Sequence, residues 1–198
     1  MTMRRALIAA VLVALAQIGF LAWTIVSHTA AMRNGKEVLL KVDPVDPRDL
    51  LRGDYVQLAY GAERVPAKIF LDRSAIDRGE AIMQVWVRLQ KQADGYWVPV
   101  AANVESPIPT PPAEDQADIK GAFGGLLPNT GADGQSETMI MADYGIGRYY
   151  VPEGEGRVIE EGIGVRPFGI LAAVAEDGTL RIKALMDGQT KLYEEPWY

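Results

Sequence analysis

The chain has 198 residues, a net charge of −6, no cysteine and one histidine, His28. Its length suits a single domain with a sizeable core. The absence of cysteine excludes disulfides, thiol catalysis and zinc sites with thiolate ligands. His28 lies just after the apolar N-terminal stretch, so a Ser-His-Asp triad or a multi-histidine metal site would have to use this one interfacial residue, which disfavours both. Because the chain is acidic, we predict no nucleic-acid binding. We also expect no metal and no cofactor.

An apolar stretch from Ala6 to Val26 predicts a transmembrane helix. Gln17 and Thr24 are the only polar side chains among its 21 residues. A helix of that length is about 31 Å long, close to the thickness of the hydrocarbon core of a bilayer. We therefore expect a single-pass membrane anchor.

Two arginines, Arg4 and Arg5, give this helix a predicted direction. By the positive-inside rule, residues 1–5 stay in the cytoplasm, and the chain beyond a juxtamembrane segment at 27–36 lies outside it. A cleaved signal peptide is the alternative, with Thr29-Ala30-Ala31 as a candidate cleavage site. The apolar run is longer than a signal peptide needs, which favours a retained anchor; both interpretations export the domain.

The sequence pattern of residues 37–198 predicts one mainly β domain, an antiparallel barrel or sandwich with few short helices. Short runs of alternating apolar and polar residues are separated by turn residues, which is typical of antiparallel sheet. The predicted strands are 37–42, 55–60, 81–90, 96–103, 169–175, 180–186 and 190–193. The turn Ala93-Asp94-Gly95 predicts a hairpin, and the last three strands predict a meander.

The segments between these strands are less regular. Residues 104–137 are rich in proline, glycine, asparagine and aspartate and predict a long loop with little regular structure. Single helical turns are expected over 73–78 and 157–162.

The most ordered local signal is the run DPVDPRDLLRGDY, from Asp43 to Tyr55. Asp46 is placed to cap a short helical turn, with Pro47 at its first position. Gly53 ends the turn, after which a strand begins.

The same run continues into the sequence Gly53-Asp54-Tyr55-x-x-Leu58-x-Tyr60. It resembles the bacterial family of membrane-anchored proteins that is named for its GDYxxLxY motif. The preceding residues 44–52 and the later run YYVPEG at 149–154 are also similar to that family, so the resemblance covers most of the exported chain. The resemblance implies an inner-membrane anchor with a periplasmic domain, and it transfers no catalytic residue.

The sequence is poor in groups for chemistry, which favours a non-catalytic interaction or structural module that works with another membrane protein. One alternative is a small-ligand cleft lined by tyrosines, although alternating tyrosines in strands are more often packing residues. A further alternative is a carboxylate-dependent hydrolase in which Asp54 or Glu153 is a buried acid with a raised pKa. The possible site comprises Asp54, Arg148, Tyr149, Tyr150 and Glu153, beside Tyr55 and Tyr60 of the motif.

Two other kinds of site find little support. The spacing Asp43-x-x-Asp46-x-x-Asp49 lacks the alternating pattern of a calcium loop. Residues 47–56 loosely resemble a segment of type I signal peptidases, which need a serine just before the proline and a lysine base. Asp46 occupies that place in this chain.

Overall fold

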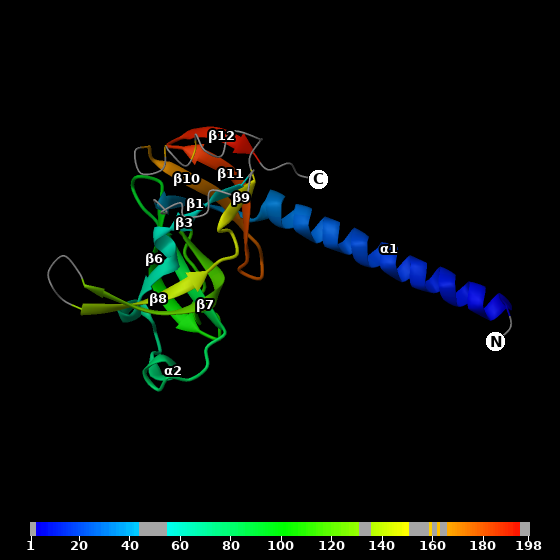
Figure 1. Ribbon diagram of the computed structural model, residues 1–198, viewed down its shortest axis with the longest axis horizontal. Coiled ribbons are helices and arrows are strands. Elements are labelled where there is room, and N and C mark those ends of the chain that lie inside the picture. The colour runs from blue at the N-terminus through cyan, green and yellow to red at the C-terminus, as the bar shows by residue number, and fades with distance from the viewer. Residues whose placement is uncertain are drawn as a thin grey trace.

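The computed structural model describes residues 3–43, 55–130, 136–150, 159, 162 and 166–194. In these ranges the domain is mainly β, as predicted, with an N-terminal helix and three short helical turns (Figure 1). The strands are β1 Lys36–Asp43, β2 Tyr55–Gln57, β3 Ala59–Tyr60, β4 Arg64–Pro66, β5 Gln84–Lys91, β6 Trp97–Val104, β7 Gln116–Thr130, β8 Ser136–Asp143, β9 Arg148–Tyr150, β10 Phe168–Val174, β11 Leu180–Asp187 and β12 Thr190–Glu194. The helices are α1 Met3–Asn34, η1 Gly61–Glu63, η2 Ala67–Ile69 and α2 Ser74–Asp77.

The strands form two antiparallel five-stranded sheets and a two-stranded ribbon. The first sheet has the order β12-β11-β10-β1-β3, the second has the order β4-β8-β7-β5-β6, and β2 pairs with β9. Alternate residues of both sheets point inward and meet in one apolar core, in which Leu40, Ile170, Val87 and Ile119 are fully buried. The segment β3-η1-β4 carries the chain directly from the first sheet into the second.

The hairpin and the meander predicted from the sequence are confirmed. β5 pairs with β6 across the turn that contains Gly95, and β10, β11 and β12 pair in succession. Gly95 and Gly178 have φ values of +88° and +82°. These turns need a left-handed residue, and glycine adopts that conformation without a steric cost. The helical turn expected at 73–78 is α2.

The prediction of a long irregular loop over 104–137 is wrong for half of that range. β7 is a 15-residue strand from Gln116 to Thr130. Its register against β8 shifts between Phe123 and Gly125, so the glycines of this region form an irregularity within a strand instead of ending it. Pro128 is tolerated because the described pairing of β7 with β5 stops at Ala122, so that beyond it β8 is the partner on one side.

The predicted strand 55–60 is divided between two sheets. Its first part, β2, belongs to the ribbon, and its second part, β3, pairs with the end of β1. Leu58 lies between the two parts and donates its backbone N–H to Gly147 O at 2.9 Å. The helical turn expected from Asp46 to Gly53 and most of the turn at 157–162 lie outside the described residues.

The turn between β10 and β11 joins the two sheets. Lys120 of β7 donates its backbone N–H to Gly178 O at 2.8 Å. A Cβ on Gly178 would lie 2.7 Å from the indole ring of Trp86 in β5, so this close approach also requires glycine.

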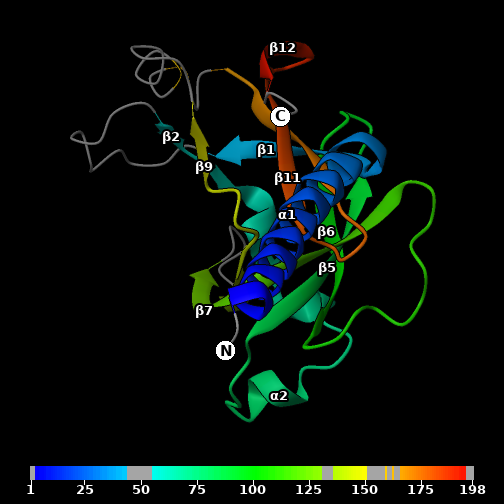
Figure 2. The same cartoon turned by 90° about the vertical axis from the view of Figure 1, so that its right-hand side faces the viewer.

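Helix α1 is longer than the predicted 6–26, because no glycine or proline interrupts the chain between Gly19 and Gly35. Within it, Leu7–Thr24 is long and apolar enough to cross a membrane, and none of that window is buried. Figure 2 views the molecule from the side at which the N-terminus of α1 lies. Residues 27–34, expected as a juxtamembrane segment, continue the same helix.

A single residue, Gly35, separates α1 from β1. Met32 in the last turn of α1 is buried, and α1 contacts β10 and β11. The Nζ atom of Lys36 donates to three backbone carbonyls and lies 5.8 Å from the centroid of the Trp97 ring. These carbonyls belong to Ala113, Glu114 and Gln116. The end of the helix is therefore fixed to both sheets.

Candidate functional site

The described parts of the GDYxxLxY motif and of the later YYVPEG run lie side by side. β2 and β9 pair antiparallel, with Tyr55 opposite Tyr150, Val56 opposite Tyr149 and Gln57 opposite Arg148. Although these segments are about 90 residues apart in sequence, they share one ribbon at the edge of the core. A site that uses both segments is therefore geometrically feasible.

Tyr60, the last residue of the motif, is fully buried. Its hydroxyl donates to Ile146 O at 2.7 Å, in the segment that leads into β9. Burial, together with the nearby Glu63 carboxylate, raises the pKa of Tyr60 far above its ordinary value, so the phenol stays protonated. The tyrosine therefore acts as a core residue that ties the motif to the chain before β9.

A second buried tyrosine repeats this arrangement. Tyr144 donates its hydroxyl to Ala62 O at 2.8 Å, and burial raises its pKa strongly as well. The bonds of Tyr60 and Tyr144 run in opposite directions between the same two segments, 60–62 and 144–146. Together they hold these segments in a fixed register.

Glu63 is a carboxyl with a raised pKa next to these tyrosines. Its Oε2 atom accepts the backbone N–H of Tyr60 at 3.1 Å and so caps η1. Burial raises the pKa of Glu63, and the carboxylates of Asp143 and Asp43 add to the effect. The hydrogen bond from the Tyr60 N–H partly offsets this rise, and so, to a smaller degree, does the positive charge of Arg64, which is ion-paired with Asp43. Glu63 thus has a structural role through its hydrogen bond to Tyr60, and its pKa is raised above the ordinary value of a carboxyl.

Replacing Glu63 by glutamine should change how stability depends on pH. A carboxyl whose pKa is raised above its ordinary value of 4.5 binds protons more tightly in the folded state, so its ionisation destabilises the fold as pH rises from about 4.5 through the raised pKa. Glutamine keeps an acceptor for Tyr60 and does not titrate. We therefore expect the variant to gain stability relative to the wild type between about pH 4 and about pH 7.

Urea midpoints of both proteins at the two pH values provide the measurement. Glu176→Gln, in the exposed turn after β10, controls for the loss of one surface charge. If the stability difference between Glu63→Gln and the wild type is the same at both pH values, the raised pKa of Glu63 is refuted.

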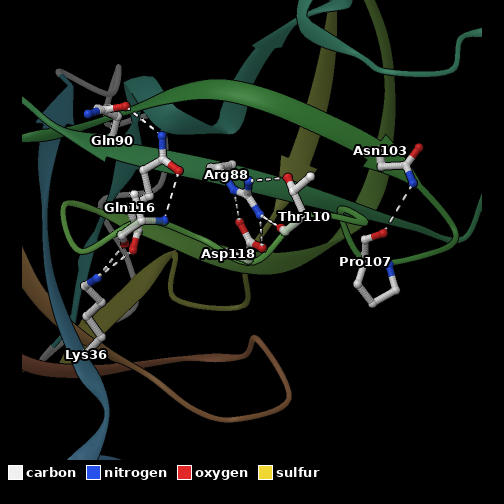
Figure 3. A network of polar contacts seen from close by, with 9 residues as sticks. Lys36, Arg88, Gln90, Asn103, Pro107, Thr110, Gln116 and Asp118 are labelled. Carbon is white, nitrogen blue, oxygen red and sulfur yellow. Dashed lines mark hydrogen bonds and ion pairs between the residues drawn. The ribbon is translucent and has the colours of Figure 1, made fainter.

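The most buried ion pair among the described residues lies elsewhere, on the second sheet (Figure 3). Arg88 donates to both carboxylate oxygens of Asp118, at 2.6 and 2.7 Å, and its side chain is 8% exposed. The same guanidinium donates to the hydroxyl and the carbonyl of Thr110. It thereby holds the irregular 105–115 segment against β5 and β7. The hydrogen bonds to Asp118 raise the pKa of Arg88 further, so its charge is permanent.

The predicted site residues fall into three groups. Gly53, Asp54 and Glu153 lie outside the described residues, so the carboxylate-hydrolase hypothesis stays a prediction. Leu58 and Tyr149 are 4% and 3% exposed and belong to the core. Tyr150 is 69% exposed, and Arg148 lies on the same strand, β9. The pairing of β2 with β9 brings the last two groups together, but burial separates them into a packed face and an exposed face.

Within the described ranges, no group of three or more histidine, cysteine, aspartate or glutamate side chains is arranged to hold a metal ion. The hydroxyls of Tyr60 and Tyr144 donate to backbone carbonyls and remain protonated. The described part of the site therefore supplies hydrogen bonds that fix the backbone.

Comparison with known proteins adds one match. A family model described as GDYXXLXY protein matches residues 17–185. The chain belongs to this family. No curated protein and no solved structure matches this GDYXXLXY protein.

Sequence reasoning about this GDYXXLXY protein missed Tyr144, Glu63 and the Arg88–Asp118 pair. Each depends on a partner from a distant strand, so no local pattern indicates it. Asp118 alternates with the buried Ala117 and Ile119, which is the ordinary pattern of a strand with one polar face, so this alternation does not indicate a buried partner. The identity of that partner as Arg88 follows only from the register of β5 against β7.

Proposed function

We propose that this GDYXXLXY protein is anchored in the bacterial inner membrane by α1, holds its β domain in the periplasm, and acts by binding another membrane protein without catalysis. The apolar window Leu7–Thr24 and the preceding arginines support the anchor and its direction. Family membership is consistent with this arrangement.

The observation that carries the binding role is a projecting hairpin. Beyond Ala122, β7 has left β5 and pairs with β8 alone, and residues 128–130 and 136–138 extend past the other strands of the second sheet. We name residues 124–130 and 136–138 the β7–β8 arm. In Figure 1 the arm projects from the side of the domain opposite α1. Leu126 and Leu127 of the arm are 49% and 45% exposed.

The position of these two leucines is what matters. Because successive residues of a strand point to opposite faces, the arm presents one leucine on each face. The sequence carries no charge between Lys120 and Asp133. An uncharged projecting strand with exposed leucines exposes apolar surface at a cost to solubility, and such surface is typical of protein interaction sites.

Photo-crosslinking in intact cells tests this role. A photoreactive residue at Leu127 should give a discrete adduct with one other membrane protein. The same residue at Leu71, which is 59% exposed but lies outside the arm, should give no such adduct. Aspartate at both arm leucines should abolish the adduct formed from a third arm position, Thr138, and should lower the melting temperature only slightly, because about half of each leucine is already exposed.

The direction of the anchor needs its own measurement. A reporter that is active only outside the cytoplasm, fused after Glu194, should be active, and the same reporter fused before Met3 should be silent. The reverse pattern would place the domain in the cytoplasm and overturn the proposed location. Equal adducts from Leu127 and Leu71, or none from the arm, would overturn the binding role.

A further inference from the structure

A hollow of about 370 Å³ lies over the face of the first sheet that points away from the core. Its floor is apolar. Leu39 and Leu171 are cross-strand partners on β1 and β10, and Met186 comes from β11; all three side chains are partly exposed, whereas Val38 and Leu40 beside them are buried in the core. The turn between β5 and β6 overhangs this floor and supplies the opposite wall. The hollow is separate from the tyrosines of the family motif.

The wall is held in place by specific contacts. Tyr96 donates its backbone N–H to Asp94 Oδ1 at 3.0 Å and its hydroxyl to Pro167 O at 2.9 Å. Its ring lies close to Gly169, where a Cβ would be only 3.1 Å from Tyr96 Cε1. The backbone N–H and the hydroxyl of Tyr96 are both hydrogen-bonded, and its ring packs where Gly169 has no side chain. The wall is therefore preorganised for a ligand.

Three charged side chains line the hollow: Glu37, Lys91 and Asp94. Glu37 is neutralised by Lys183, whose Nζ donates to Glu37 Oε1 at 2.6 Å. Lys91, the last residue of β5, and Asp94, in the turn that follows it, remain as one positive and one negative group. Among the ion pairs within 4.0 Å in the described part of the chain, none joins Lys91 to Asp94. The hollow thus combines an apolar floor with two opposite charges at its rim.

We propose that this hollow binds a small zwitterionic molecule with an apolar side chain, the chemical class of an apolar amino acid or a short unblocked peptide. The apolar part covers Leu39, Leu171 and Met186. The ammonium group faces Asp94 and the carboxylate faces Lys91. A fatty acid would satisfy Lys91 and leave its carboxylate next to Asp94, so the charge pattern favours the zwitterion. This binding site is independent of the proposed role of the β7–β8 arm.

Titration of the full chain in lipid nanodiscs with the dipeptide leucyl-leucine tests the proposal. Saturable binding is expected by calorimetry. Lys91→Gln and Asp94→Asn should each weaken it about two- to five-fold, the effect of one solvent-exposed ion pair. Asparagine retains the acceptor for the Tyr96 N–H, so the wall should be preserved. Arg181→Gln, an exposed charge on β11 outside the lining, should leave binding unchanged.

A dipeptide with a blocked N-terminus shows whether the ligand's ammonium group contacts Asp94. N-acetyl-leucyl-leucine has no ammonium group, so it should bind the wild type more weakly and bind Asp94→Asn as well as it binds the wild type. Leu171→Trp should fill the hollow and abolish binding of both probes. No saturable binding at about 10 mM leucyl-leucine would overturn the proposal, as would tighter binding of octanoate than of the dipeptide, or equal losses for the blocked and unblocked probes in Asp94→Asn.

Discussion

Replacing Tyr60 by alanine is expected to destabilise the domain by about 3–5 kcal/mol, the usual cost of deleting a large buried aromatic side chain. The ring is fully buried where β3 leads into η1, and its hydroxyl is bonded to Ile146 O. Since whole domains are stable by only about 5–15 kcal/mol, this loss is a large fraction of the total. Urea unfolding of the full chain in lipid nanodiscs, followed by near-UV circular dichroism, measures it.

Two companion variants separate the contribution of the buried ring from that of the hydroxyl. Tyr60→Phe keeps the ring and removes the hydroxyl, which leaves a buried carbonyl without its donor and should cost about 1–3 kcal/mol. Tyr150→Ala is the matched control on the exposed face of the ribbon, where 69% exposure predicts a change within about 0.5 kcal/mol. Equal losses at Tyr60 and Tyr150 would contradict the division of the motif region into a packed face and an exposed face.

Removing the charge of Arg88 is expected to have a comparable effect for a different reason. Arg88→Met leaves Asp118, whose side chain is only 16% exposed, without a cation, and breaking one side of such a pair costs about 3–5 kcal/mol. The variant also releases Thr110, so the 105–115 segment should become a site of rapid cleavage by added protease. Denaturation midpoints and limited proteolysis measure the two effects.

The double variant Arg88→Met, Asp118→Leu decides whether the cost lies in the orphaned charge. It should recover most of the stability lost in the single variant, because no ion is then left in the sheet. Lys68→Met breaks the pair between Lys68 and Glu137, in which the lysine side chain is 71% exposed, and should cost less than about 1 kcal/mol. A double variant no more stable than Arg88→Met alone would show that packing, and not charge, dominates.

Much of the architecture is predictable because it is local. The Ala93-Asp94-Gly95 and Glu176-Asp177-Gly178 turns combine residues that accept a left-handed backbone with flanking alternation, and both hairpins are present in the structure. The anchor-like helix follows from composition alone. These features depend on neighbours within a few residues, which a sequence displays directly.

The features that sequence reasoning missed depend on distant partners or on irregular strands. β7 contains three glycines and a proline, residues that ordinarily disfavour a strand, yet a register shift and a missing neighbour on one side accommodate them. The ribbon of β2 and β9 requires residues about 90 positions apart to find each other. The motif letters fix Leu58 and Tyr60 in the sequence but do not tell that both are core residues.

The way in which α1 meets the domain has a mechanical consequence. Gly35 is the single residue between α1 and β1, Met32 is buried, and Lys36 is hydrogen-bonded to the second sheet. We therefore expect helix and domain to move as one rigid body. Transmembrane helices tilt by about 20° on average, to a degree that depends on the thickness of the lipid around them. In the proposed membrane-anchored arrangement, a change in the tilt of α1 would swing the far end of the molecule through the same angle, and lipid thickness would then set where the β7–β8 arm points.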